Sequence, residues 1–300
     1  MRMGGAVIDP FRGPAETIRM YSVVTSNRNR LPDLVQSLRT WQSSSLIAEI
    51  VVVDFGSDRP IELDDFAAPD KIKIVRVLNT DQWRPGLAHN IGVDHANQPA
   101  ICKLDADIAI RDETWLRGID TAGAFYRGHH TGPVSHGQVV FAKRHWQAVG
   151  GYHEWLAGYG FEDSDFYIRL RKSGLPQHAI DPRFLGETTH SLESRTTPKI
   201  VTEFFALDPP DPRTRLQFTG SRNTYLAYMC AWQPHMRLAY KSQPLAGGTV
   251  AVELPPFPEA YRKAAAFANC LALIRMTGAG EHVDLLNAMM AKFLGEDGGL

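Results

Sequence analysis

Ile47-Ala48-Glu49-Ile50-Val51-Val52-Val53 is a nearly apolar stretch, and it ends at once in the turn-forming run Asp54-Phe55-Gly56-Ser57. Glu49 is the only polar residue of the stretch, which therefore has no polar face to leave in water. A short apolar run bounded by turn residues is typical of a strand that is buried on both faces of a sheet. Such strands belong to parallel sheets covered by helices, and we expect this stretch to lie near the centre of one.

The segments around this strand alternate between strand and helix patterns. Residues 20–25 form a further apolar run, and from Leu31 to Trp41 apolar residues recur at helical spacing. The patterns predict strands at 20–25, 47–53, 71–78 and 101–104, and helices at 31–41 and 87–96. This order is typical of a mostly parallel α/β sheet flanked by helices. Because ligands bind beyond the carboxyl ends of parallel strands, we expect a site where these strands end in polar turns.

The remaining sequence predicts further elements and a change of character near residue 207. Helices are expected at 113–126, 144–149 and 162–172, and strands at 134–142 and 177–180. The breaker Asp208-Pro209-Pro210-Asp211-Pro212 precedes helices expected at 213–232, 257–276 and 281–294, with a link at 243–258. We therefore expect an arm at 1–19, a catalytic domain at 20–206 and a helical C-terminal region at 207–300.

Composition narrows the class of protein. The chain has 300 residues, 44% of them hydrophobic, which is enough for a sizeable core, and a formal net charge of −1, which argues against a nucleic-acid partner. The cysteines, Cys102, Cys230 and Cys270, have no paired spacing, so a reducing, cytoplasmic setting is expected. We find no apolar run of transmembrane length and no signal peptide. Peripheral membrane contact, or contact between copies, through the C-terminal helices stays open.

An acidic pair follows the strand at 101–104. Asp105 and Asp107 are two residues apart, and on an extended chain their side chains would leave the same face. Adjacent carboxylates repel each other unless a cation lies between them, and Mg²⁺ or Mn²⁺ held in this way also binds diphosphate oxygens. The alternative is a solvated turn, which a lone acidic pair would favour. Because the chain has a second acidic cluster, we favour the binding of a metal-bound diphosphate by Asp105 and Asp107 over a solvated turn.

That second cluster lies in Gly158-Tyr159-Gly160-Phe161-Glu162-Asp163-Ser164-Asp165. Carboxylates at the start of a helix are often caps, but this explains one acidic residue and not three. A sugar hydroxyl needs a carboxylate base within hydrogen-bond reach, and Asp163 is the predicted base, with Glu162 as its acceptor-binding neighbour. Tyr159 and Phe161 offer a flat apolar face for a sugar ring.

Three isolated residues are weaker candidates. Asp54 either binds a nucleobase or ribose group or closes an Asx turn, and Arg84 either contacts the diphosphate or is a surface arginine. His190 follows the last predicted strand of the sheet and is the predicted third metal ligand. A competing group at 129–136, formed by His129, His130 and His136, has no carboxylate nearby in sequence and is ranked below it.

The order of these motifs resembles a known family. The motifs are Thr25-Ser26-Asn27-Arg28, Val51-Val52-Val53-Asp54, Arg84-Pro85-Gly86-Leu87-Ala88-His89-Asn90, Asp105-Ala106-Asp107 and the segment from Gly158 to Asp165. Together they resemble a GT-A fold glycosyltransferase of the family 2 type. Residues 137–169, with the Gly150-Gly151 turn, are similar to the C-terminal part of the galactosyltransferase and N-acetylgalactosaminyltransferase group. The resemblance covers residues 20–195.

The resemblance implies a set of roles. Mn²⁺ or Mg²⁺ would be held by Asp105, Asp107 and His190, and the donor, a UDP-sugar, by Thr25, Arg28, Asp54, Arg84 and Asp105. Asp163 matches the base of the inverting members, which transfer a sugar to a hydroxyl of a glycan or related acceptor. Two residues depart from the family pattern, because Tyr159 replaces a tryptophan and Phe161 replaces a glycine.

Two alternatives from other classes stay open. A sugar nucleotidyltransferase would carry a glycine-rich loop after the first strand, and Thr25-Ser26-Asn27-Arg28-Asn29-Arg30 has no glycine. A non-catalytic module that binds nucleotide-sugars or glycans would have no need of the complete acidic set Asp105, Asp107 and Asp163.

Overall fold

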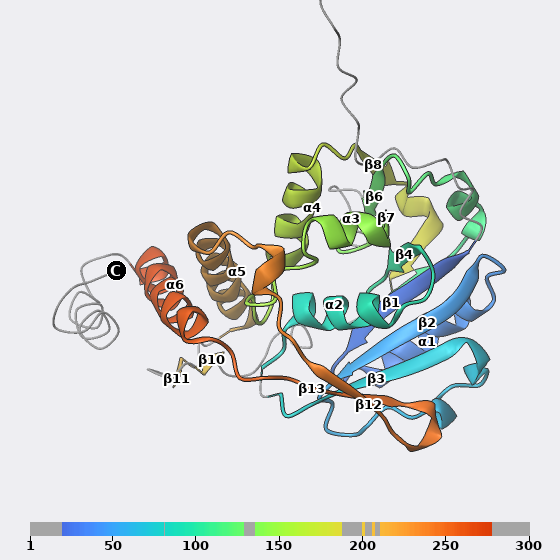
Figure 1. The fold of residues 1–300 in the computed structure, drawn as a ribbon, viewed down its shortest axis with the longest axis horizontal. Helices are drawn as coiled ribbons and strands as arrows, with labels where there is room; N and C mark the ends of the chain where they lie inside the picture. The colour runs from blue at the N-terminus through green and yellow to red at the C-terminus, as the bar shows by residue number, and fades with distance from the viewer. Residues whose placement is uncertain are drawn as a thin grey trace, which may run out of the picture.

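The computed structural model describes residues 20–80, 82–128, 136–187, 200–201, 206–207 and 211–277. Within them a nine-stranded sheet runs in the order β12-β13-β3-β2-β1-β4-β7-β6-β8 (Figure 1). Its strands are β1 (Tyr21–Asn27), β2 (Ile47–Phe55), β3 (Ile72–Leu78), β4 (Ala100–Lys103), β6 (Phe125–Gly128), β7 (Val139–Ala142), β8 (Gln177–Ile180), β12 (Lys241–Pro244) and β13 (Val250–Glu253). The run β13-β3-β2-β1-β4 is parallel throughout.

Side-chain alternation along the central strands gives the sheet two buried faces. On β2, Ile50 and Val52 point into the same core as α1 (Leu31–Gln42), whereas Val51 and Val53 join the core under α2 (Pro85–His95). Helices α1 and α2 therefore cover opposite faces, as Figure 1 shows. The predicted α/β class and the buried central strand are confirmed.

The remaining elements surround this sheet. They are α3 (Lys143–Ala148), α4 (Glu162–Lys172), α5 (Pro212–Met229), α6 (Glu259–Thr277) and the short strands β5 (Ile108–Ile110), β9 (Leu185–Glu187), β10 (Ile200–Val201) and β11 (Ala206–Leu207). Helices α5 and α6 pack side by side through Phe218, Ala272 and Leu273. The arm at 1–19 and the helix expected at 281–294 lie outside the described residues. None of the helices in the described ranges is long and apolar enough to cross a bilayer.

Two predicted elements are wrong. The helix expected at 113–126 is a short 3-10 turn, Glu113–Gly118, which Asp112 caps by accepting from Thr114 N–H at 2.8 Å, and β6 begins soon after it. The link expected at 243–258 instead carries strands. There β12 and β13 form an antiparallel hairpin, and β13 pairs in parallel with β3 because Ala251 and Val252 are apolar enough to be buried at that edge.

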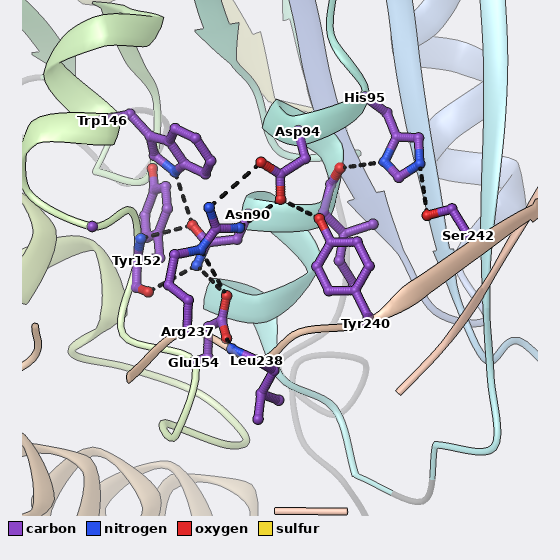
Figure 2. Close-up of polar contacts among 12 residues, drawn as sticks. Asn90, Asp94, His95, Trp146, Tyr152, Glu154, Arg237, Leu238, Tyr240 and Ser242 are labelled. Atoms are coloured by element: carbon purple, nitrogen blue, oxygen red, sulfur yellow. Dashed lines mark hydrogen bonds and ion pairs between the residues drawn. The ribbon is translucent and has the colours of Figure 1, made fainter. Parts of the chain in front are cut away.

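A polar network fastens the segment before this hairpin to α2 and to the loop after α3 (Figure 2). The carboxylate of Glu154 is fully buried and accepts from Asn90 Nδ2 at 2.8 Å, from Leu238 N–H at 2.7 Å and from Arg237 Nε at 3.3 Å. The guanidinium of Arg237 also forms an ion pair with Asp94 at 2.5 Å. The C-terminal segment is thus tied to the helix that covers the sheet.

Replacing Glu154 with alanine should destabilise the fold by about 3 kcal/mol, because it removes the buried acceptor of three donors, the half-buried Arg237 guanidinium, Asn90 Nδ2 and the Leu238 N–H. Chemical denaturation measures the loss. Glu259→Ala is the matched control, since Glu259 also pairs with an arginine but its side chain is 56% exposed. The control should change stability by no more than about 0.5 kcal/mol. Equal losses in the two variants would contradict the stated role of the network.

Candidate active site

The backbone turns at the end of β4. After Asp105 the chain does not stay extended, because Ile108 N–H donates to the carbonyl of Asp105 at 3.0 Å and Ile108 then begins β5. The expectation that Asp105 and Asp107 leave one face of an extended chain is therefore wrong. After the turn, β5 pairs with β9 in antiparallel orientation.

A second sharp bend places the start of α4 opposite β4. Gly158, Gly160 and Phe161 all have positive φ angles, of 71°, 101° and 74°. Glycine adopts this conformation readily, whereas Phe161 is held there by the structure around it. The first helical turn then presents Glu162 and Asp163.

Lys103 joins the two acidic segments. Its Nζ lies 2.8 Å from Asp105 Oδ1 and 3.4 Å from Asp163 Oδ1, and it donates to the carbonyl of Gly137 at 2.7 Å. Asp105 Oδ2 accepts from Gln138 Nε2 at 2.9 Å. Asp105 and Asp163 therefore belong to one site, with the ammonium group between them.

The surroundings shift the pKa values of Asp105, Glu162 and Asp163 in different directions. Burial raises the pKa of Asp163 to about 6, with the Lys103 ammonium opposing the rise and the Asp105 carboxylate adding to it. Burial and the neighbouring Asp163 carboxylate raise the pKa of Glu162 to about 8. Burial acts in the same sense on Asp105, but Lys103 outweighs it and the pKa falls. At neutral pH Asp163 is the ionised carboxylate of the neighbouring pair and Glu162 is mostly protonated.

The sequence analysis missed Lys103. Burial disfavours its charged form, but the carboxylates of Asp105 and Asp163 outweigh burial and raise its pKa, so the side chain stays charged. A signal was present, because Lys103 interrupts an apolar strand two residues before Asp105. That spacing on a strand places both side chains on one face.

Asp105 and Asp107 fit a hard divalent cation. Both offer carboxylate oxygens, which Mg²⁺ and Mn²⁺ prefer, and the Asp105 side chain is 39% exposed and therefore accessible. Asp107 is buried and lies 3.2 Å from the guanidinium of Arg30. Within the described ranges no three His, Cys, Asp or Glu side chains form a metal-ligand group. His190, the predicted third ligand, lies outside those ranges, as do His129 and His130.

Asp54 has internal partners for both carboxylate oxygens. Oδ1 accepts from Ser57 N–H at 3.1 Å, and Oδ2 accepts from Ile61 N–H at 3.2 Å and from Arg76 at 3.0 Å. The side chain is fully buried. These contacts favour the turn-closing interpretation of Asp54, and its contact with the nucleotide stays a prediction.

Arg84 is also held by the protein. Its guanidinium donates to the carbonyl of Trp155 at 3.1 Å, to Gln82 Oε1 at 3.1 Å and to Tyr261 Oη at 2.7 Å, and it stacks over the ring of Phe257 at 4.0 Å. It is buried and not a surface arginine. These contacts support the loop after α3, and the predicted contact of Arg84 with the diphosphate is not tested by them.

The carboxyl end of β1 carries buried polar atoms. Thr25 Oγ1 and both side-chain amide atoms of Asn27 are buried, with no hydrogen-bond partner among the described residues. Arg28 follows and is half-buried. Because an unsatisfied buried polar group is costly, Asn27 joins Thr25 as a candidate contact for the donor, although sequence reasoning did not select it.

Helix α5 supports the loop that carries Tyr159 and Phe161. Asn223 Nδ2 donates to the carbonyl of Gly160 at 2.7 Å, and the ring of Phe161 lies 6.0 Å from that of Tyr228. Tyr159 is 45% exposed, which leaves its ring accessible to a ligand. The third acidic residue of the cluster, Asp165, forms an ion pair with Arg169 at 2.7 Å and is structural.

Comparisons with known proteins bear on the fold and the class of protein. Residues 122–191 match the family described as the N-terminal domain of galactosyltransferase. The fold is similar to the catalytic domain of Drosophila beta1,4galactosyltransferase 7 in complex with xylobiose, with a TM-score of 0.52 and 12% identity over 80% of this chain and 95% of that one. A mannosyltransferase of Pyrobaculum calidifontis in complex with GDP-Man and Mn²⁺ has a TM-score of 0.49 and 14% identity over 92% of this chain and 81% of that one.

No curated protein sequence matches the chain significantly. The family match and the fold of the Drosophila enzyme confirm the predicted similarity to galactosyltransferases and the GT-A fold, and the family match covers the segment with the Gly150-Gly151 turn and the acidic cluster of α4. The predicted enzyme class, glycosyltransferase, agrees with both.

Replacing Gly137 with alanine should disturb this site without unfolding the protein. The added Cβ would lie 2.5 Å from Asp105 Oδ2 and 3.2 Å from both Asp163 Oδ2 and Lys103 Nζ. These atoms end flexible side chains, so Asp105 moves and the backbone stays. We expect Mn²⁺ affinity, measured by calorimetry, to fall at least about tenfold, with the melting temperature within about 4 °C of the original value.

Gly118→Ala is the control for this substitution, because a Cβ at Gly118 meets nothing within 4 Å. Unchanged Mn²⁺ affinity in Gly137→Ala would mean that Asp105 does not bind the metal.

Proposed function

We propose that the chain is a metal-dependent, inverting glycosyltransferase that moves a sugar from a nucleoside diphosphate donor, UDP-linked, to a hydroxyl group of a glycan acceptor. The observation that carries the proposal is the contact of Lys103 with both Asp105 and Asp163. It brings a carboxylate suited to a metal-bound diphosphate next to a carboxylate suited to proton abstraction. A glycan acceptor is supported by the xylobiose complex of the Drosophila enzyme.

Asp163 is the proposed general base. A base works best when its pKa lies near the working pH, and the pKa of Asp163 is raised to about 6. As the acceptor oxygen forms its bond to the anomeric carbon, its proton passes to the Asp163 carboxylate. The bond from the anomeric carbon to the diphosphate oxygen breaks, and its electron pair leaves with the nucleoside diphosphate. A single displacement of this kind inverts the configuration.

Residues around Asp163 orient the two substrates. Asp105 and Asp107 would hold Mn²⁺ or Mg²⁺, which neutralises charge on the leaving diphosphate. Glu162, mostly protonated at neutral pH, can donate a hydrogen bond to an acceptor oxygen, and the exposed ring of Tyr159 can stack on the acceptor sugar. His190 stays the proposed third ligand.

Asp163→Asn removes the base but keeps the size of the side chain. We expect kcat to fall by about 10²–10⁴-fold, while donor affinity, measured by calorimetry, changes little. The control is Asp181→Asn, which alters an aspartate in an exposed ion pair with Arg183. Near-normal turnover in Asp163→Asn would refute the role of the base, and a wild-type protein that binds donors without turnover would be a binding module.

Metal removal provides a second test. Excess EDTA should abolish sugar transfer, and added Mn²⁺ or Mg²⁺ should restore it. Asp105→Asn should need at least about tenfold more metal for half-maximal activity. Full transfer in the presence of EDTA would remove the metal from the mechanism while leaving the role of Asp163 intact.

The dependence of activity on pH should reflect the raised pKa of Asp163. The base is active only when deprotonated, and its raised pKa keeps it protonated at higher pH than an ordinary aspartate. We therefore expect kcat/KM to fall about tenfold per pH unit below pH 6 and to level off above it. Activity that persists unchanged down to pH 4 would contradict the assignment.

A further inference from the structure

The inference concerns Lys103 and rests on the proposed function. We infer that the ammonium group of Lys103 is a resident cation that competes with a divalent metal for Asp105, so that the metal binds tightly only together with the donor diphosphate. Lys103 would thus be a positioning residue that makes metal and nucleotide binding depend on each other.

The first support is that the ammonium group is fixed in place. The Lys103 side chain is 2% exposed, and three oxygen atoms surround its Nζ, from Asp105, Asp163 and the carbonyl of Gly137. Lys103 is the last residue of β4, whose partners β1 and β7 hold it on both sides. A lysine on the surface can swing away from an arriving cation, whereas this one is enclosed.

The second support is the separation between the two cations. Lys103 Nζ lies 2.8 Å from Asp105 Oδ1. A metal bound to that oxygen at about 2.1 Å would lie no more than about 5 Å from the ammonium group. Positive charges at that distance repel each other even with partial screening. The second carboxylate oxygen of Asp105 also has a partner, because Oδ2 accepts a hydrogen bond from Gln138 Nε2 at 2.9 Å.

The nucleotide removes this penalty. A diphosphate brings at least two negative charges into the same space, so the metal and the ammonium group then share an anion between them. Binding of the nucleotide should therefore raise the affinity for the metal, and the metal should raise the affinity for the nucleotide by the same factor. Without the charge of Lys103, we expect the nucleotide and the metal to raise each other's affinity by a smaller factor.

A purely structural role for Lys103 makes a different prediction. If the lysine served only to neutralise two carboxylates, its loss would loosen the site, and metal affinity would fall or stay the same. Competition predicts the opposite sign, because removing the ammonium leaves two carboxylates that need a cation. The sign of the change in metal affinity separates the two roles.

The experiment measures Mn²⁺ affinity by electron paramagnetic resonance of free Mn²⁺, with and without UDP. Lys103→Met should bind Mn²⁺ alone at least about tenfold more tightly than the wild type, and the enhancement by UDP should shrink by a similar factor. Lys143→Met is the matched control, since Lys143 lies beyond the opposite end of β4 and donates to the carbonyl of Ala96 at 2.8 Å. The control should bind Mn²⁺ as the wild type does.

Lys103→Gln, which keeps hydrogen-bond donors without the charge, should show the same gain and serves if Lys103→Met does not fold. The inference is overturned if the wild type binds Mn²⁺ at Asp105 and the charge-free variants bind it equally or more weakly. The proposed function would survive that result. If no variant binds Mn²⁺, with or without UDP, the metal role in the proposed function fails and this inference fails with it.

Discussion

The ion-paired contact of Lys103 with Asp105 and Asp163 is the interaction on which the site depends. Burying a charge is costly unless it is paired, and here one ammonium group balances two carboxylates from segments far apart in the sequence. Their meeting links the end of β4 to the start of α4. Gly137 lies against the same group, since a Cβ there would come within 2.5 Å of Asp105 Oδ2.

The C-terminal part of the chain belongs to the support of this site. The loop between α3 and α4 is held by Trp232, whose Nε1 donates to the carbonyl of Gly150 at 2.8 Å, and by Asn223, which binds the carbonyl of Gly160. The buried carboxylate of Glu154 ties the same loop to α2 (Figure 2). A change in α5 would therefore be transmitted to Tyr159 and Phe161, the residues proposed to face the acceptor.

Much of the fold was readable in the sequence because its signals are local. The apolar run of β2 and the helical spacing of α1 decide their own structure, and the alternation of strands and helices along the chain follows from such local patterns. The helix expected at 113–126 failed because the cap at Asp112 closes only a short turn. The hairpin β12–β13 was missed because the pattern at 243–258 shows its turn residues more clearly than its pairing with β3.

The site was readable only in part, for a related reason. Acidic clusters can be recognised in the sequence, whereas the partners of a single side chain depend on tertiary contacts. Asp54 and Arg84 each had two interpretations, a ligand contact or a turn-closing or surface role, and the sequence could not show that both have several protein partners. Lys103 was passed over because it lies inside a strand, and its partner Asp163 is contributed by another part of the chain.

The central claim is that Asp105 and Asp163 act in one place, and anomalous diffraction from crystals grown with Mn²⁺ and UDP tests it most directly. The account predicts a manganese peak about 2 Å from an Asp105 carboxylate oxygen, with Asp163 facing the open side of the same site. A peak away from Asp105, or one with Asp163 walled off from the bound nucleotide, would contradict it.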